Sequence, residues 1–328
     1  MTAYAGGFFD VPKEVYVNLT AAFGEKKRDK FFVGPMGHEK VTQFKIETVQ
    51  CYTQDMPLGK KYVIQMKTEG VVEFKAEFYP NEQDNNTIDF LRDWGIYKST
   101  TSFPNANVEE LVSKWFVNLL SEQQLYFNKI VMEILPESPE IGFRDWEVQT
   151  LNITIPNEPY EDGLLEWWLG KFKQNIEVVI ITSMTQTVNI PDNPNFFRAT
   201  NLELKGLFDI PMALFPRITA KKITFEDLSG TSIVNSDVVR LILNDWLAVL
   251  GTPRDVKFMG NYGEEDIEEN VVKYLEKKAN LQNTDDVTRE YLFESGSRNE
   301  SATIIFYKKD TTLHLRIIPI NPPKKSSK

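Results

Sequence analysis

The chain has 328 residues, of which 41% are hydrophobic and 26% charged, as in a folded globular protein with room for one large core or two to three smaller ones. Its 47 acidic and 37 basic residues give a net charge of −10, and a surface of that sign repels nucleic-acid phosphates and anionic lipids. We therefore expect neither a nucleic acid nor a membrane as its partner.

Cysteine use and the N-terminal residues indicate the compartment. A single cysteine, Cys51, excludes an internal disulfide framework and suits a reducing environment. The chain starts without the basic and apolar regions of a secretory signal, and no stretch approaches the roughly 20 apolar residues that span a bilayer. The sequence predicts a cytoplasmic or nuclear protein.

The first segment, residues 1–35, predicts one short amphipathic helix. Pro12 suits the first turn of a helix, Val15 and Leu19 lie one turn apart on one side, and Gly24 is a natural stop. The apolar side of such a helix needs a partner to cover it.

Residues 36–104 change to the two-residue period of strands. Apolar and charged side chains alternate through residues 72–78, and two further strands are expected at residues 41–52 and 61–67. This segment is predicted to form a small antiparallel sheet.

Helices and strands are expected to alternate over residues 105–318. Asn107 can cap the first of these helices, and three helices carry Trp115, Trp168 and Trp246 among aliphatic residues at helical spacing, which favours a role in the core. The strands recur roughly every 20 to 35 residues, so each strand–helix unit must bury its apolar face on the next unit.

The predicted fold class is therefore α/β. A small N-terminal antiparallel sheet is followed by an irregular, leucine-rich-repeat-like stack of alternating strands and helices. Closing strands are expected at residues 302–307 and 313–318, and residues 319–328 are expected to be a disordered tail. The predicted domains are residues 1–35, 36–104 and 105–318, followed by that tail.

Residues for catalysis are sparse. The histidines, His38 and His314, form a poor zinc ligand set with Cys51, and no nucleophile elbow, phosphate loop or dinucleotide fingerprint occurs. Acidic clusters at residues 158–162 and 263–269 leave a carboxylate-dependent hydrolase as an alternative, although the second cluster is typical of a helix N-terminus. We expect no enzyme, no cofactor and no metal site.

Two tryptophans fall outside the helical pattern. Trp94 follows Arg92-Asp, and Trp146 follows Arg144-Asp. Exposed tryptophans are frequent anchors of protein interfaces. Trp94 and Trp146 are therefore candidate partner-binding residues.

A family resemblance rests on three segments of the sequence. The first, Trp167-Trp-Leu-Gly-Lys-Phe, leads into a strand, and the second, Ile223-Thr-Phe-Glu-Asp-Leu-Ser-Gly, leads into a helix ending in Trp246. The third and looser one is Arg298-Asn-Glu-Ser-Ala. With them, residues 107–318 resemble the F-box-associated type 2 domain, an expanded family of nematode proteins. Glu300 and Ser301 stand where that family has Asp and Gly. In the family, the domain selects a protein for ubiquitin ligation, and an N-terminal F-box binds a Skp1-type adaptor.

The resemblance extends to the N-terminus, where Phe9, Val11, Pro12, Val15 and Leu19 are similar to the opening of an F-box. It implies that these five residues contact the adaptor. Strand-like sequence begins by about residue 41, which leaves room only for a shortened F-box or for none that works. We expect a non-enzymatic protein-binding module that resembles the substrate-recognition part of an F-box protein. The alternative is a stand-alone scaffold, decoy or antidote without a ubiquitin-ligase link.

Overall fold

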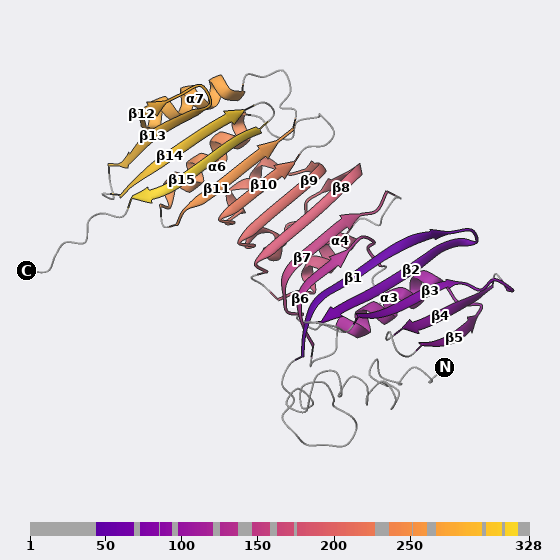
Figure 1. The fold of residues 1–328 in the computed structure, drawn as a ribbon. Helices are drawn as coiled ribbons and strands as arrows, with labels where there is room; N and C mark the ends of the chain where they lie inside the picture. The colour runs from indigo at the N-terminus through magenta and orange to yellow at the C-terminus, as the bar shows by residue number, and fades with distance from the viewer. Residues whose placement is uncertain are drawn as a thin grey trace, which may run out of the picture. The chain divides into compact units, whose positions relative to one another are not determined.

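The computed structural model shows a protein dominated by β-sheet (Figure 1). The chain forms two compact units, one of Met1–Pro156 with Tyr160–Lys173 and one of Asn157–Pro159 with Gln174–Lys328. In each unit, helices cover one face of a mixed sheet. The structure describes residues 44–68, 73–84, 86–93, 98–120, 125–136, 146–157, 163–173, 176–226, 236–250, 252–260, 267–296, 300–309 and 312–320.

The first unit has seven described strands in the order β7-β6-β1-β2-β3-β4-β5. Strands β1 to β5 form an antiparallel meander, while β1 and β6, and β6 and β7, pair in parallel. The strands are β1 (Phe44–Met56), β2 (Gly59–Thr68), β3 (Glu73–Pro80), β4 (Thr87–Asp93), β5 (Lys98–Pro104), β6 (Leu125–Met132) and β7 (Val148–Ile155).

Helix α3 (Val108–Leu120) covers the apolar face of the meander. Phe74, Phe78 and Phe90 come from three strands, and the Trp115 ring lies 5.7 to 6.2 Å from each of their rings. The predicted cap of this helix is confirmed, because the Asn107 side chain accepts a hydrogen bond from the backbone N–H of Glu109 at 2.8 Å.

A second aromatic cluster surrounds α4 (Leu164–Gly170). Trp168 is fully buried, and its indole N–H donates to the carbonyl of Pro136 at 3.0 Å. Its ring lies 5.7 Å from Phe116 of α3 and 5.9 Å from Trp146. The tryptophan therefore joins two helices of the first unit.

The second unit has eight described strands in the order β12-β13-β14-β15-β11-β10-β9-β8. Strands β8 to β11 run parallel in chain order, and β15 joins β11 to an antiparallel meander. The strands are β8 (Val178–Asn189), β9 (Asn201–Asp209), β10 (Lys222–Glu226), β11 (Arg254–Met259), β12 (Asn280–Thr284), β13 (Thr288–Ser295), β14 (Glu300–Lys309) and β15 (Thr312–Ile320). The helices are α5 (Pro194–Phe197), the 3-10 helix η1 (Met212–Arg217), α6 (Ser236–Ala248) and α7 (Ile267–Lys278).

In the second unit, one face of the strands is buried under helices. Phe215 of η1 lies 6.2 Å from Phe225, which stacks on Phe258 at 5.3 Å. Trp246 of α6 is buried, and the guanidinium of Arg254 lies 5.5 Å from its ring centre. Figure 1 shows α6 and α7 on the same side of the strands.

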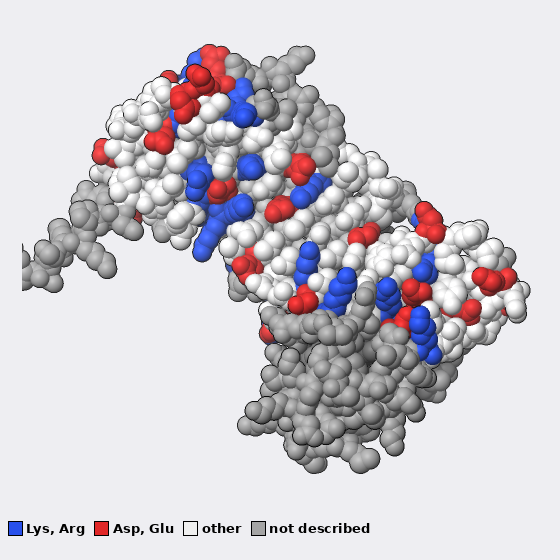
Figure 2. All heavy atoms as spheres, viewed as in Figure 1, with Lys and Arg blue, Asp and Glu red and all other residues white. Residues whose placement is uncertain are grey.

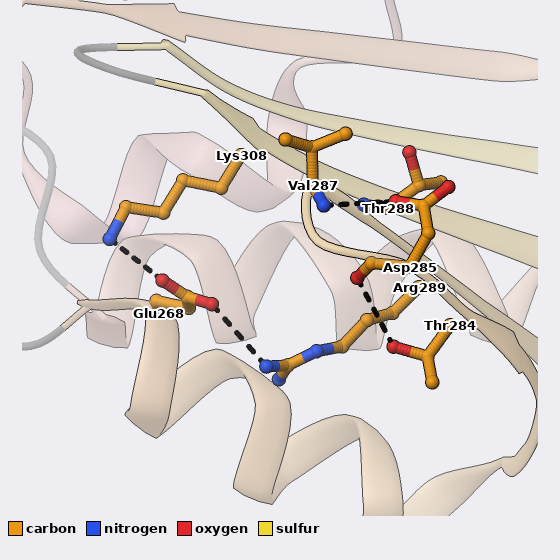
Figure 3. A network of polar contacts seen from close by, with 7 residues as sticks. All are labelled: Glu268, Thr284, Asp285, Val287, Thr288, Arg289 and Lys308. Atoms are coloured by element: carbon orange, nitrogen blue, oxygen red, sulfur yellow. Dashed lines mark hydrogen bonds and ion pairs between the residues drawn. The ribbon is translucent and has the colours of Figure 1, made fainter.

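Polar contacts tie α7 to the sheet (Figure 3). Glu268, in the first turn of the helix, accepts from Lys308 of β14 at 2.8 Å and from Arg289 of β13 at 3.4 Å. The turn before β13 is held by Asp285, whose carboxylate accepts from the backbone N–H groups of Val287 and Thr288 at 2.9 and 2.7 Å.

The predicted fold class is wrong. The described residues form fifteen strands of mixed sheet with few helices, not a small antiparallel sheet followed by a strand–helix stack. Strand β1 pairs in parallel with β6, so the N-terminal meander belongs to the same sheet as the strands after it. At the other end, β12 to β15 pair with one another as a meander.

The predicted closing strands are confirmed as β14 and β15. Pro319 and Ile320, which were assigned to a tail, are still part of β15, and residues 321–328 lie outside the described residues. The predicted boundary at residue 104 falls within the first unit, and the division of the chain into four segments stays a prediction.

Candidate binding surface on the second sheet

In the second unit, the face of the sheet opposite the helices, which we call the open face, carries the polar side chains of β10, β11, β14 and β15. Strand side chains alternate between faces, so the residues between the buried ones point to this face. By strand register they lie in rows, the first formed by Lys222, Asp255, Arg316 and Ile305 and the second by Thr224, Lys257, His314 and Tyr307.

Asp255 is the central acidic residue of these rows. Its carboxylate lies 2.7 Å from His314 Nε2 and 3.5 Å from Arg316 Nε. Partial burial opposes its ionisation, but the hydrogen bond from His314 and the charges of His314, Arg316 and Lys222 outweigh that effect. The pKa of Asp255 therefore lies below its ordinary value, and the residue carries a negative charge at neutral pH.

Two lysines lie beside this ionic group. Lys222 is exposed and Lys257 is half-buried, and neither forms an ion pair with a carboxylate of the described residues. Figure 2 shows Lys and Arg side chains gathered around acidic ones on this part of the second unit. We call Lys222, Lys257, His314 and Arg316, with Asp255 at their centre, the basic cluster.

Apolar side chains continue the open face along β14 and β15. Ile318 and Ile320 follow Arg316 at two-residue intervals, so they share its face, and they are 36% and 42% exposed. Ile305 and Tyr307 of β14 are half-buried beside the basic cluster. Charged and apolar side chains are therefore presented together on one rigid surface.

The sequence-based hypothesis that Trp146 is an exposed interface anchor needs correction. Trp146 is only 6% exposed, and its ring lies 5.9 Å from Trp168 and 5.5 Å from Phe172. Its backbone forms a bridge with Phe172, which draws the indole into the aromatic cluster of the first unit. Burial of a large apolar ring stabilises the core, and Trp146 presents no free ring surface to a partner.

The other candidate binding residues lie outside the described residues. These are Trp94 and the five residues assigned to adaptor binding, Phe9, Val11, Pro12, Val15 and Leu19. Their roles stay predictions.

Two of the described residues that were candidates for catalysis, Cys51 and Glu268, have structural settings. Cys51 is buried in β1, and burial, with the nearby charge of Glu133, raises the pKa of its thiol. Glu268 of the second acidic cluster is held in ion pairs by Arg289 and Lys308. His38 and residues 158–162 are not among the described residues.

Two kinds of feature are absent from the described residues. They contain no group of three or more His, Cys, Asp or Glu side chains placed to hold a metal ion. None of their helices has the length and apolar character needed to cross a membrane.

Sequence reasoning missed the basic cluster, although one signal for it was present. Polar or charged residues occupy alternate positions in β10, β11 and β15, and His314 lies between Leu313 and Leu315. In the sheet, Lys222 lies opposite Asp255, and Asp255 lies opposite Arg316, although the members of these pairs are up to 61 residues apart in the sequence. No local pattern specifies those pairs.

Comparison of the chain with models of protein families, with curated proteins and with solved structures finds no match. The resemblance to the F-box-associated type 2 domain therefore stays a prediction.

Proposed function

We propose that the chain is a non-enzymatic protein-binding module and that the open face of the second unit is its recognition surface. The observation that carries this proposal is the composition of that face. Two lysines that have no ion pair among the described residues lie there with an arginine, beside exposed isoleucines and a half-buried tyrosine. Arginine and tyrosine are enriched at protein interfaces, which combine an apolar centre with polar groups around it. A sheet also holds such side chains in fixed positions, which reduces the entropy lost on binding.

The corresponding face of the first unit is less suited to recognition because its charged and polar groups contact one another. Lys61 pairs with Glu77 at 3.3 Å, with both side chains only 19% exposed. Tyr52 donates to Gln65 at 3.3 Å. Groups satisfied in this way offer less to a partner than the lysines of the basic cluster.

Affinity purification with matched variants tests the proposal. The full chain and the variant I318E/I320E, altered on the open face, are compared with V249E/L281E, which changes two exposed apolar residues elsewhere on the second unit. We expect proteins from a lysate of the source organism to be captured by the wild type and the control and lost by I318E/I320E. Equal capture by all three chains would contradict the proposal.

The link to ubiquitin ligation rests on the family resemblance alone. As a substrate receptor, the chain would bind a Skp1-type adaptor through its N-terminal residues. Mixing the purified full chain with such an adaptor on a sizing column separates the alternatives. Co-elution supports the receptor, and separate elution supports a stand-alone scaffold, decoy or antidote.

A further inference from the structure

We infer that the basic cluster binds a short acidic segment of a partner protein. Carboxylates of that segment would pair with Lys222, Lys257 and Arg316, and its apolar side chains would contact Ile318 and Ile320. The inference rests on the proposed function and deepens it, because it names the chemistry of the partner.

The charge balance of the cluster favours an acidic ligand. Three permanent cations, Lys222, Lys257 and Arg316, surround one carboxylate, that of Asp255, so these four residues have a formal charge of 3 − 1 = +2. The whole chain carries −10. A positive site on an acidic protein favours an acidic ligand, because the cations of the site attract the ligand while the net negative charge of the chain repels it from other surfaces.

The ion pairs within the cluster involve Arg316 and His314 but neither lysine. Asp255 already has His314 and Arg316 within 4 Å, and the two lysines have no ion-pair partner among the described carboxylates. Asp255 thus holds Arg316 in place and leaves both ammonium groups to an incoming anion. Arg316 itself is half exposed, so it keeps donors for a second carboxylate.

The spacing of the rows also fits an extended peptide. Lys222 and Arg316 are separated by one intervening strand, which is about 10 Å at the usual strand spacing. Alternate side chains of an extended peptide recur about every 7 Å on one side, so two or three acidic residues meet the cations at once. Ile318 lies two positions beyond Arg316 and gives the same peptide an apolar contact.

A long polyanion fits this face less well. On the same face, Glu226 lies at the other end of β10 from Lys222, and Glu203 lies on the neighbouring strand β9, where it pairs with Lys205 at 3.5 Å. A continuous phosphate backbone that extended beyond the cluster would meet these carboxylates. The basic cluster is therefore confined to the length of a few residues.

Selection of peptides on the full chain provides the test. The probe is a displayed library of random peptides of about 12 residues, long enough when extended to cross the cluster. Selected peptides are then synthesised, and their affinities are measured by fluorescence anisotropy. The variant K222E/K257E alters the cluster, and K277E/K278E makes the same charge change at the end of α7, on the helical side of the sheet. Circular dichroism confirms that each variant folds, and K222Q/K257Q replaces the first if it does not.

We expect the selected peptides to be rich in Asp and Glu with interspersed apolar residues. Their affinity should fall about tenfold or more in K222E/K257E, remain unchanged in K277E/K278E and weaken as salt rises from about 50 to 500 mM. Peptides in which Lys replaces the acidic residues should bind K222E/K257E instead.

Five results would overturn the inference. The first is a set of selected peptides without enrichment in Asp and Glu. The second is a set of peptides that lose binding in I318E/I320E but not in K222E/K257E. Both would refute the acidic ligand and leave the proposed function intact. An absence of selected peptides would refute it too, whereas the lysate comparison decides the proposed function separately. Tighter binding of a single-stranded DNA oligonucleotide than of the peptides would assign the cluster to a nucleic acid. Self-association that K222E/K257E abolishes would assign it to a second copy of the chain.

Discussion

The adjacent tryptophans of α4 allow a sharp test of the packing in the first unit. Trp168 is fully buried and donates to the Pro136 carbonyl, whereas Trp167 is only half-buried and contacts Lys171 at 4.6 Å. Trp168→Ala removes a buried indole, which costs about 3–5 kcal/mol of unfolding free energy, including the cavity that it leaves. Trp168→Phe retains most of the ring but leaves that carbonyl without its donor, at about 1–2 kcal/mol.

Trp167→Ala is the matched control. It removes the same side chain one residue away, and we expect a loss of about 1 kcal/mol because part of that ring is already in water. Urea unfolding followed by far-ultraviolet circular dichroism gives the unfolding free energy of all three variants without relying on tryptophan fluorescence. Equal losses in Trp167→Ala and Trp168→Ala would refute the assignment of Trp168 as the residue that joins the helices.

Three further predictions concern single residues. Gly206 has φ +109°, and an added Cβ would lie 1.7 Å from the Ser183 carbonyl oxygen. Gly206→Ala should therefore lower the midpoint of thermal unfolding and cost more than about 1 kcal/mol of unfolding free energy. An unchanged midpoint would contradict that contact. Because the folded pKa of Asp255 is lowered, its contribution to stability is present above the unfolded pKa of about 3.9 and is lost as the pH falls below it. The stability difference between wild type and Asp255→Asn, measured by urea unfolding, should therefore narrow between neutral pH and about pH 3. Cys51 is buried with a raised thiol pKa, so it should react with a disulfide reagent far more slowly in native buffer than in urea, and equal rates would place it at the surface.

Local patterns predicted individual elements well. The alternation over residues 72–78 corresponds to β3, in which Phe74 and Phe78 are buried, and the helices with Trp115, Trp168 and Trp246 are α3, α4 and α6. These periods arise from side chains within one element, which is why a single sequence reveals them.

Pairing between distant elements was not predictable in the same way. Strand β1 pairs with its neighbour β2 and also with β6, about 80 residues further along. A hairpin signals its register through its turn, but a parallel pair carries no such local signal. The burial of Trp146 has the same origin, because its partner Phe172 is 26 residues away. The basic cluster likewise depends on the register of three strands.

The central claim is that the open face of the second unit contacts a partner protein. Site-specific incorporation of the photocrosslinker p-benzoylphenylalanine tests it most directly, because two half-buried tyrosines lie on opposite sides of the sheet. Tyr307 is on the open face, and Tyr274 is on α7 beside Asn244. Irradiation of each full chain in lysate should give a covalent adduct with a partner from position 307 and none from position 274. An adduct from position 274 alone would contradict the account and assign binding to the helical side.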